Sequence, residues 1–173
     1  MSYYMLRPCD VGEPGVTNTH AEYNGELDER WILLSPGESV DGWPSITFER
    51  RGKDWPDLLE NDSMGDLVSQ RARDIIEPLA GERVTWLPVY VRAKKEGRAY
   101  WLMHLTRTDD VLDMERSDGD RKSVIKPFVD EEKAKGLHLF TWDGDERILV
   151  SEELKRAAEA AGLSNFAFTP ASD

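Results

Sequence analysis

Histidine, cysteine and clustered carboxylates are the side chains in this sequence that could act as catalysts or metal ligands. The three histidines, His20, His104 and His138, are far apart in the chain, and no two have the spacing of metal ligands. The sequence also lacks the HExxH pattern of zinc-dependent hydrolases. Because His104 and His138 each lie between apolar neighbours, we interpret both as strand residues and not as ligands.

Carboxylates are densest in a short segment in the second half of the chain: Asp109, Asp110, Asp113, Glu115, Asp118 and Asp120. An EF-hand calcium loop needs glycine at position 6 and glutamate at position 12. Counted from Asp113, Gly119 stands at position 7 and Val124 at position 12. The pattern therefore favours a solvated loop, and an acidic metal site in this segment stays open as an alternative.

The single cysteine, Cys9, excludes an internal disulfide and a zinc site built from several cysteines. As a nucleophile it would need a base close to it in space, and its flanking residues match no catalytic motif. The chain also lacks the nucleophile-elbow, phosphate-loop and dinucleotide-binding patterns. We therefore predict a protein that is not an enzyme and needs no cofactor or metal. The alternative is a small hydrolase that uses Cys9 or an acidic metal site.

The net charge of the chain is −12, from 34 acidic and 22 basic residues. The acidity is concentrated in residues 1–42, 109–120 and 143–153, which have net charges of −6, −5 and −4. A protein that binds nucleic acid directly needs a positive surface, so the charge argues against that function. Negative clusters attract basic proteins and speed their association. We predict a basic protein partner, with solubility as the simpler explanation of the charge.

Tryptophan is common where proteins bind each other, and two of the six tryptophans, Trp43 and Trp55, lie in predicted loops beside prolines. Each is either an interface residue or an anchor that packs its own loop. Together with the acidic segment, these tryptophans complete the set of candidate partner-binding residues: Trp43, Trp55, Asp109, Asp110 and Asp113.

Two helices with an apolar face are predicted around these candidates. Ser69 and Ser151 are N-cap candidates, because a serine hydroxyl accepts hydrogen bonds from the free amides of the first turn. Apolar residues follow each serine at the third, sixth, seventh and tenth positions, which indicates one buried stripe. Glycines follow both stripes, so we predict helices over residues 69–79 and 151–161. Pro78 should kink or shorten the first helix.

Most other apolar segments predict strands. They cover residues 3–6, 31–34, 84–91, 100–106 and 148–150, with a closing strand around Phe166 and Phe168. Residues 57–60 are predicted to form a single helical turn. Because most connections are too short for parallel crossovers, we predict an α+β fold of mainly antiparallel sheet with two principal amphipathic helices.

The matching spacings after Ser69 and Ser151 indicate either a duplicated unit that forms two small lobes or only the ordinary period of a capped helix. With 173 residues, the chain is predicted to be a single domain, 1–173, with candidate sublobes 1–106 and 107–173. No apolar run is long enough to cross a membrane, and the first residues do not resemble a signal peptide. We therefore expect a cytoplasmic protein without membrane contact.

The order of short segments along the chain resembles a family of bacterial polymorphic-toxin immunity proteins with a myxobacterial prototype, first described as a domain of unknown function. The segments that carry the resemblance are residues 3–8, 44–48, 57–59, 67–71, 87–89, 110–113, 139–140, 148–152 and 161–163, then Phe166 and Phe168. They span most of the chain, and residues 12–40 are the least similar to the family.

The resemblance implies a non-enzymatic protein that binds and neutralises a cognate toxin in the cytosol. It supplies no catalytic residues, in agreement with the missing catalytic motifs. Many toxins of such systems act on nucleic acid through a basic cleft, which an acidic inhibitor can occupy in place of phosphate. An acidic adaptor or chaperone for a secreted effector is a further alternative.

Overall fold

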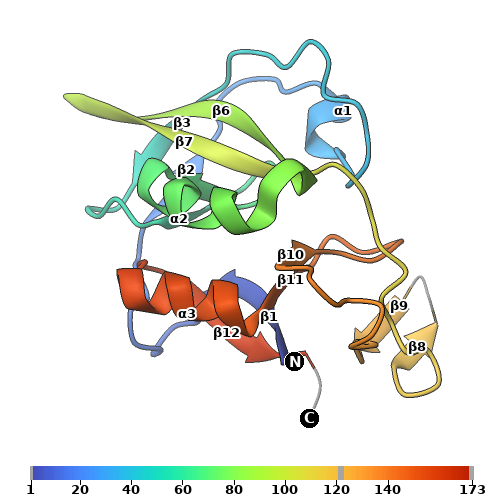
Figure 1. The fold of residues 1–173 in the computed structure, drawn as a ribbon. Coiled ribbons are helices and arrows are strands. Elements are labelled where there is room, and N and C mark those ends of the chain that lie inside the picture. Colours follow the sequence, from blue (N-terminus) through green and yellow to red (C-terminus); the bar gives the residue numbers. More distant parts are fainter. Residues whose placement is uncertain (1, 121–122, 172–173) are drawn as a thin grey trace.

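The computed structural model describes residues 2–120 and 123–171, which form two lobes (Figure 1). The upper lobe in this view contains a closed barrel with the strand order β2-β3-β6-β7-β5-β4. Its strands are β2 (His20–Glu22), β3 (Thr47–Arg51), β4 (Leu58–Asn61), β5 (Leu67–Ser69), β6 (Val84–Ala93) and β7 (Glu96–Leu105). This barrel lobe also contains the helices α1 (Glu29–Ile32), α2 (Gln70–Ala80) and the short 3-10 helix η1 (Gly81–Arg83).

The lower lobe contains an antiparallel sheet with the order β10-β11-β1-β12. Its elements are β1 (Tyr3–Pro8), β10 (Leu139–Phe140), β11 (Ile148–Ser151), the helix α3 (Glu152–Ala161) and β12 (Phe166–Pro170). A separate hairpin is formed by β8 (Asp118–Asp120) and β9 (Ser123–Lys126). The first strand of the chain, β1, therefore lies in the middle of a sheet whose other strands come from residues 139–170.

Both predicted amphipathic helices are confirmed, together with their caps. The Ser69 hydroxyl accepts a hydrogen bond from the Ala72 amide at 3.1 Å, and the Ser151 hydroxyl accepts one from the Leu154 amide at 3.2 Å. Pro78 lies inside α2 without ending it, and the helix continues to Ala80. These capped helices, α2 and α3, lie side by side between the two lobes (Figure 1).

Two local predictions are wrong. Residues 31–34, predicted as a strand, instead begin within the short helix α1, where the Asp28 carboxylate accepts a hydrogen bond from the Arg30 amide and Trp31 is buried. A short apolar run does not by itself distinguish a strand from a helical turn. Residues 57–60, predicted as a helical turn, lead into β4, which pairs with β5 and β2. Pairing with distant strands determines that this segment is extended, and the local sequence does not show which strands will pair.

The predicted α+β class with mainly antiparallel sheet is confirmed in outline. The barrel nevertheless includes two parallel pairs, β2 with β4 and β3 with β6, which the sequence did not predict. The units β5–α2 and β11–α3 resemble each other locally, but the first belongs to the barrel and the second to the open sheet. The duplication therefore stays a prediction.

Buried side chains inside and between the lobes form the core. The barrel interior is filled by Ala21, Ile46, Phe48, Leu59, Leu67, Leu87, Val89, Val91, Tyr100 and Leu102. A second cluster joins the lobes, with Ile76 from α2, Met103 from β7 and Leu154 from α3 in one apolar group. Because this shared cluster draws on both lobes, it holds them together. Among the described residues, no helix is long and apolar enough to span a membrane.

Candidate functional site

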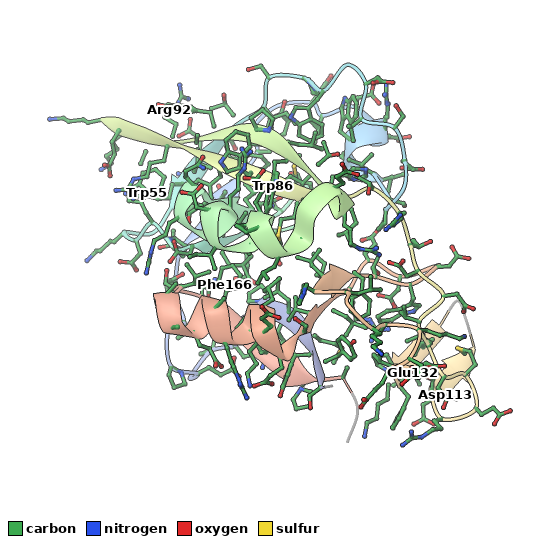
Figure 2. The ribbon with its side chains drawn as sticks, in the orientation of Figure 1. Trp55, Trp86, Arg92, Asp113, Glu132 and Phe166 are labelled. Carbon is green, nitrogen blue, oxygen red and sulfur yellow. The ribbon has the colours of Figure 1, made fainter. Side chains whose placement is uncertain are left out.

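The lower lobe presents an acidic surface around a polar depression of about 600 Å³. Asp113, Glu131 and Glu132 line this depression together with Asp130 and Arg116. Figure 2 shows Asp113 and Glu132 next to each other at the end of the lobe that carries the β8–β9 hairpin. Asp110 and Asp143 line a second depression on the same lobe. We call the set Asp110, Asp113, Glu131, Glu132 and Asp143 the acidic face.

Two turns build this acidic face, and each is held by an aspartate. The Asp113 carboxylate accepts hydrogen bonds from the amides of Glu115 and Arg116 at 3.0 and 3.3 Å. In the second turn, the Asp130 carboxylate accepts hydrogen bonds from the amides of Glu132 and Lys133 at 3.1 and 3.3 Å. A β-bridge between the buried residues Leu112 and Val129 holds the two turns side by side.

Asp110, the second predicted candidate in this segment, is exposed on the same lobe. Its carboxylate lies 3.3 Å from the ammonium group of Lys133, and both side chains are largely in solvent. A surface ion pair of this kind contributes only about 0–1 kcal/mol to stability. Asp110 is therefore accessible to a partner.

Asp109 has a different environment, because its carboxylate pairs with the Arg83 guanidinium inside the protein. The two side chains are 18% and 12% exposed, and the Asp109 amide donates a hydrogen bond to the Thr141 carbonyl at 2.9 Å. Burial lowers the pKa of Arg83 from its usual value, although the guanidinium stays charged. Asp109 thus ties the start of the acidic segment to η1, which follows α2, and to Thr141, which follows β10 of the lower sheet.

We expect the Asp109→Asn substitution to lower the free energy of unfolding by about 2 kcal/mol, because it leaves the Arg83 charge partly buried and unpaired. Urea denaturation followed by tryptophan fluorescence measures this change. The matched control is Asp110→Asn, which should change stability by less than about 0.5 kcal/mol because Asp110 is exposed. Equal effects of the two substitutions would contradict this assignment of Asp109.

The candidate tryptophans both lie half-buried in the barrel lobe. The Trp43 indole donates to the Pro88 carbonyl at 2.9 Å and packs edge-to-face on Trp31, with ring centres 5.2 Å apart. The Trp55 indole donates to the Glu96 carboxylate at 2.9 Å and lies against the guanidinium groups of two arginines, Arg50 and Arg98. Both residues therefore anchor their own loops and also keep part of their surface in solvent.

The structure does not bring the five predicted candidates into one site. Figure 2 shows Trp55 and Asp113 at opposite ends of the molecule, in the barrel lobe and the lower lobe. Asp110 and Asp113 line two different depressions of the lower lobe, and Asp109 forms a partly buried pair with Arg83. A partner that contacts both a tryptophan and the acidic face would have to cover much of one side of the protein.

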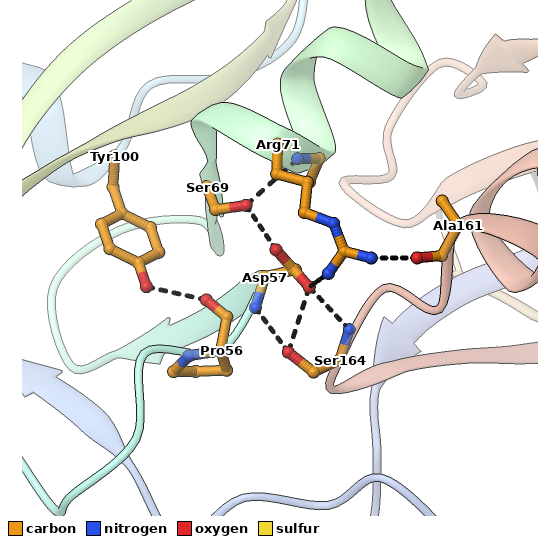
Figure 3. Close-up of polar contacts among 8 residues, drawn as sticks. Pro56, Asp57, Ser69, Arg71, Tyr100, Ala161 and Ser164 are labelled. Carbon is orange, nitrogen blue, oxygen red and sulfur yellow. Dashed lines mark hydrogen bonds and ion pairs between the residues drawn. The ribbon is translucent and has the colours of Figure 1, made fainter.

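A buried carboxylate that was not among the predicted candidates, Asp57, joins the two lobes (Figure 3). The residue is 6% exposed. One carboxylate oxygen accepts a hydrogen bond from the Ser69 hydroxyl at 2.7 Å, and this hydroxyl also caps α2. The other oxygen accepts from the Arg71 guanidinium at 3.2 Å and from the amide and hydroxyl of Ser164 at 2.9 and 3.1 Å.

This Asp57 network links the start of α2 to the segment after α3. The Arg71 guanidinium also donates to the Ala161 carbonyl at the end of α3 (Figure 3). Next to it, the Tyr100 hydroxyl donates to the Pro56 carbonyl at 2.7 Å, and burial raises the pKa of this tyrosine. All of these groups satisfy one another, which is typical of a structural network. Residues 57–59 and 67–71 also belong to the segments that carry the family resemblance.

The residues that could support the hydrolase alternative do not converge. The Cys9 thiol is buried 3.7 Å from the Pro14 carbonyl, and its burial raises the pKa, which keeps the thiol protonated. His104 is buried in β7 beside the Glu38 carbonyl, and His138 contacts the Ser151 hydroxyl. Within the described part of the chain, no three His, Cys, Asp or Glu side chains are grouped to hold a metal ion. The Asp120 side chain lies outside the described residues.

Comparisons with known proteins give one finding about the family. No curated protein matches the chain. Residues 3–173 match the immunity protein family (Imm11), so the match includes both lobes, the acidic face and every segment on which the sequence resemblance depends. Because the match covers essentially the whole chain, the protein is a member of the immunity protein family (Imm11).

Proposed function

We propose that this protein binds a cognate toxin in the cytoplasm and neutralises it without catalysis. The observation that carries the proposal is the match of residues 3–173 to the immunity protein family. The structure supports binding as the means of action, because most side chains of the acidic face are exposed, with Asp113 half-buried, and hydrogen bonds hold its two turns in place. Such side chains can contact a protein without moving the backbone.

The charge distribution supports a basic toxin as the partner. Asp110 and Glu132 are exposed on the acidic face of a protein whose net charge is −12. The field of such a surface attracts a positively charged protein over about a Debye length, roughly 8–10 Å at physiological salt. The acidic face should therefore set mainly the rate of association, and aromatic contacts should set mainly the rate of dissociation.

The direct test is protection of a cell. The toxin domain is taken from the gene beside the one that encodes this chain, and it is expressed with and without the chain in a sensitive bacterium. We expect growth arrest by the toxin alone, growth with the chain, and a purified complex of the two proteins. A chain that restores growth without binding the toxin would overturn non-catalytic neutralisation, and a chain that fails to protect would overturn the toxin-immunity role.

The rate of association tests the acidic face. The Asp110→Asn/Glu132→Gln variant should bind the toxin domain more slowly, by about threefold or more at low salt, and with less dependence on salt than wild type. The matched control is Asp74→Asn/Glu159→Gln, which removes the same two charges from exposed positions on α2 and α3. Stopped-flow fluorescence at low and high salt measures the association rates of wild type and of both variants. Identical salt dependence in all three proteins would show that the acidity serves solubility only.

Dissociation rates in the same experiment test the two tryptophans. We expect Trp43→Ala or Trp55→Ala to speed dissociation, because a tryptophan in an interface contributes about 2 kcal/mol or more. Each substitution also removes an intramolecular contact, to Pro88 or to Glu96. Circular dichroism and thermal unfolding of the free variants therefore accompany the kinetics. Unchanged dissociation in both variants would place the interface elsewhere.

A further inference from the structure

A cavity of about 470 Å³ lies between the barrel lobe and the lower sheet. Its apolar wall comes from both lobes and includes Leu6 of β1, Trp31 of α1, Met103 of β7 and Ile148 of β11. Both the size and the mixed lining are typical of sites that bind a ligand or a partner's side chain. None of the residues of the acidic face lines this cavity.

Two arginines line the cavity, and acidic groups of the protein already neutralise both. The Arg7 guanidinium pairs with Glu13 at 2.7 Å and with Asp10 at 3.1 Å. The Arg147 guanidinium pairs with Asp145 at 2.6 Å. His104, which also lines the cavity, has its Nε2 atom 2.9 Å from the Glu38 carbonyl oxygen. These groups are therefore satisfied without a ligand.

Two carboxylates that line the cavity, Asp66 and Glu146, have no hydrogen bond or ion pair with the described residues. Burial raises the pKa of Asp66 to about 6, and the nearby charge of Glu60 adds to the effect. A carboxylate in such surroundings destabilises the free protein, so its presence calls for an explanation. A cation in the cavity would give the half-buried Asp66 a partner, with the exposed Glu146 as a second, weaker contact.

One large apolar side chain of the cavity lining is exposed to solvent. Ile32, which lines the cavity, is 44% exposed, and its neighbour Leu33 is 66% exposed. Both belong to the end of α1, whose other apolar residue, Trp31, is buried and packed on the candidate Trp43. The exposed Ile32 and the carboxylates of Asp66 and Glu146 line the same cavity, a combination that suits a long basic side chain with an aliphatic stem.

We propose that this cavity receives a lysine or arginine side chain of the cognate toxin, with its stem against the apolar wall and its cationic group between Asp66 and Glu146. The inference rests on the proposed function and adds to it a contact site separate from the acidic face. Charge complementarity selects this occupant, because the free charges of the cavity are negative while its arginines are already paired. An inserted basic side chain is a typical interface anchor.

The test measures binding of the toxin domain from the neighbouring gene to three purified variants. We expect Asp66→Asn to weaken binding by about tenfold or more, mainly through faster dissociation, because it leaves the inserted cation without its half-buried partner. Glu146→Gln should weaken binding by a smaller factor, since Glu146 is exposed. The matched control, Asp74→Asn, removes a charge from α2 outside the cavity and should bind like wild type.

A second arm identifies the toxin's side chain. Each lysine and arginine on the toxin surface is replaced by alanine, and we expect one replacement to weaken binding to wild type but not to weaken binding to Asp66→Asn any further. If Asp66→Asn fails to fold, Glu146→Gln takes its place in this cycle. If both cavity variants bind the toxin with wild-type affinity, the inference is overturned. The proposed function would still be supported in that case if the wild-type chain protects the cell. A wild-type chain that does not bind the toxin would overturn both.

Discussion

Replacing Asp57 by alanine should lower the free energy of unfolding by about 3–5 kcal/mol, the effect of removing one partner from a buried charged network. The carboxylate accepts four hydrogen bonds, from Ser69, Arg71 and the amide and hydroxyl of Ser164. Without it, the Ser164 amide and the hydroxyl that caps α2 lose an acceptor in a place that water reaches poorly. Urea denaturation at pH 7 measures the loss.

The control for this prediction is Asp54→Ala, three residues earlier in an exposed loop. It removes the same side chain, and we expect a change of less than about 0.5 kcal/mol. Asp57→Asn should lie between the two, since an amide oxygen can still accept from Ser164 but no longer carries the charge that pairs with Arg71. If Asp57→Ala lowers the free energy of unfolding by less than about 1 kcal/mol, water must satisfy the groups that Asp57 now binds.

Replacing Asp66 by asparagine should, in contrast, stabilise the protein. We expect the free energy of unfolding at neutral pH to rise by roughly 3 kcal/mol at most. Burial raises the pKa of Asp66 from 3.8 to about 6 in the folded protein. The folded state therefore holds this proton more tightly than the unfolded state, and the wild type loses stability as the pH rises from about 4 to about 6. The asparagine variant carries no charge there and escapes this loss.

The pH dependence provides the check. The stability difference between Asp66→Asn and wild type should be small near pH 4, grow up to about pH 6 and stay constant above it. Urea denaturation at half-unit pH steps measures this difference, with Asp74→Asn as an exposed control that should follow wild type. A difference that does not change with pH would mean that Asp66 is well solvated. Greater stability combined with weaker toxin binding would identify Asp66 as a functional carboxylate.

The helices and the general class of the fold could be predicted from the sequence because their signals are local. Ser69 and Ser151 cap helices wherever an apolar stripe of the right period follows them. The barrel could not be predicted, because its strand order does not follow the chain: β5 lies between β4 and β7. Two of the strand pairs in the barrel, β2–β4 and β3–β6, are also parallel. Which strands become neighbours depends on contacts between distant parts of the chain, which local patterns do not encode.

The candidate site shows the same division between local and distant information. The exposed turn at Asp113 could be predicted from the density of acidic residues. The pairing of Asp109 could not, because its partner Arg83 lies on another element. The roles of Asp57 and Asp66 also depend on surroundings, since one carboxylate finds four donors and the other finds none among the described residues. The charged surface could therefore be located from the sequence better than the buried Asp57 and the half-buried Asp66.

The position of β1 affects how each molecule is made. The ribosome synthesises β1 before every other described strand, whereas its neighbours β11 and β12 are synthesised only after the barrel strands. The barrel, from residues 20–105, can close during synthesis, while β1 waits for partners at the other end of the chain. An interrupted chain would leave the central strand with two unpaired edges, which favour aggregation and degradation. The lower sheet can therefore assemble only after residues 166–170 have been synthesised, so folding of this lobe comes later than closure of the barrel.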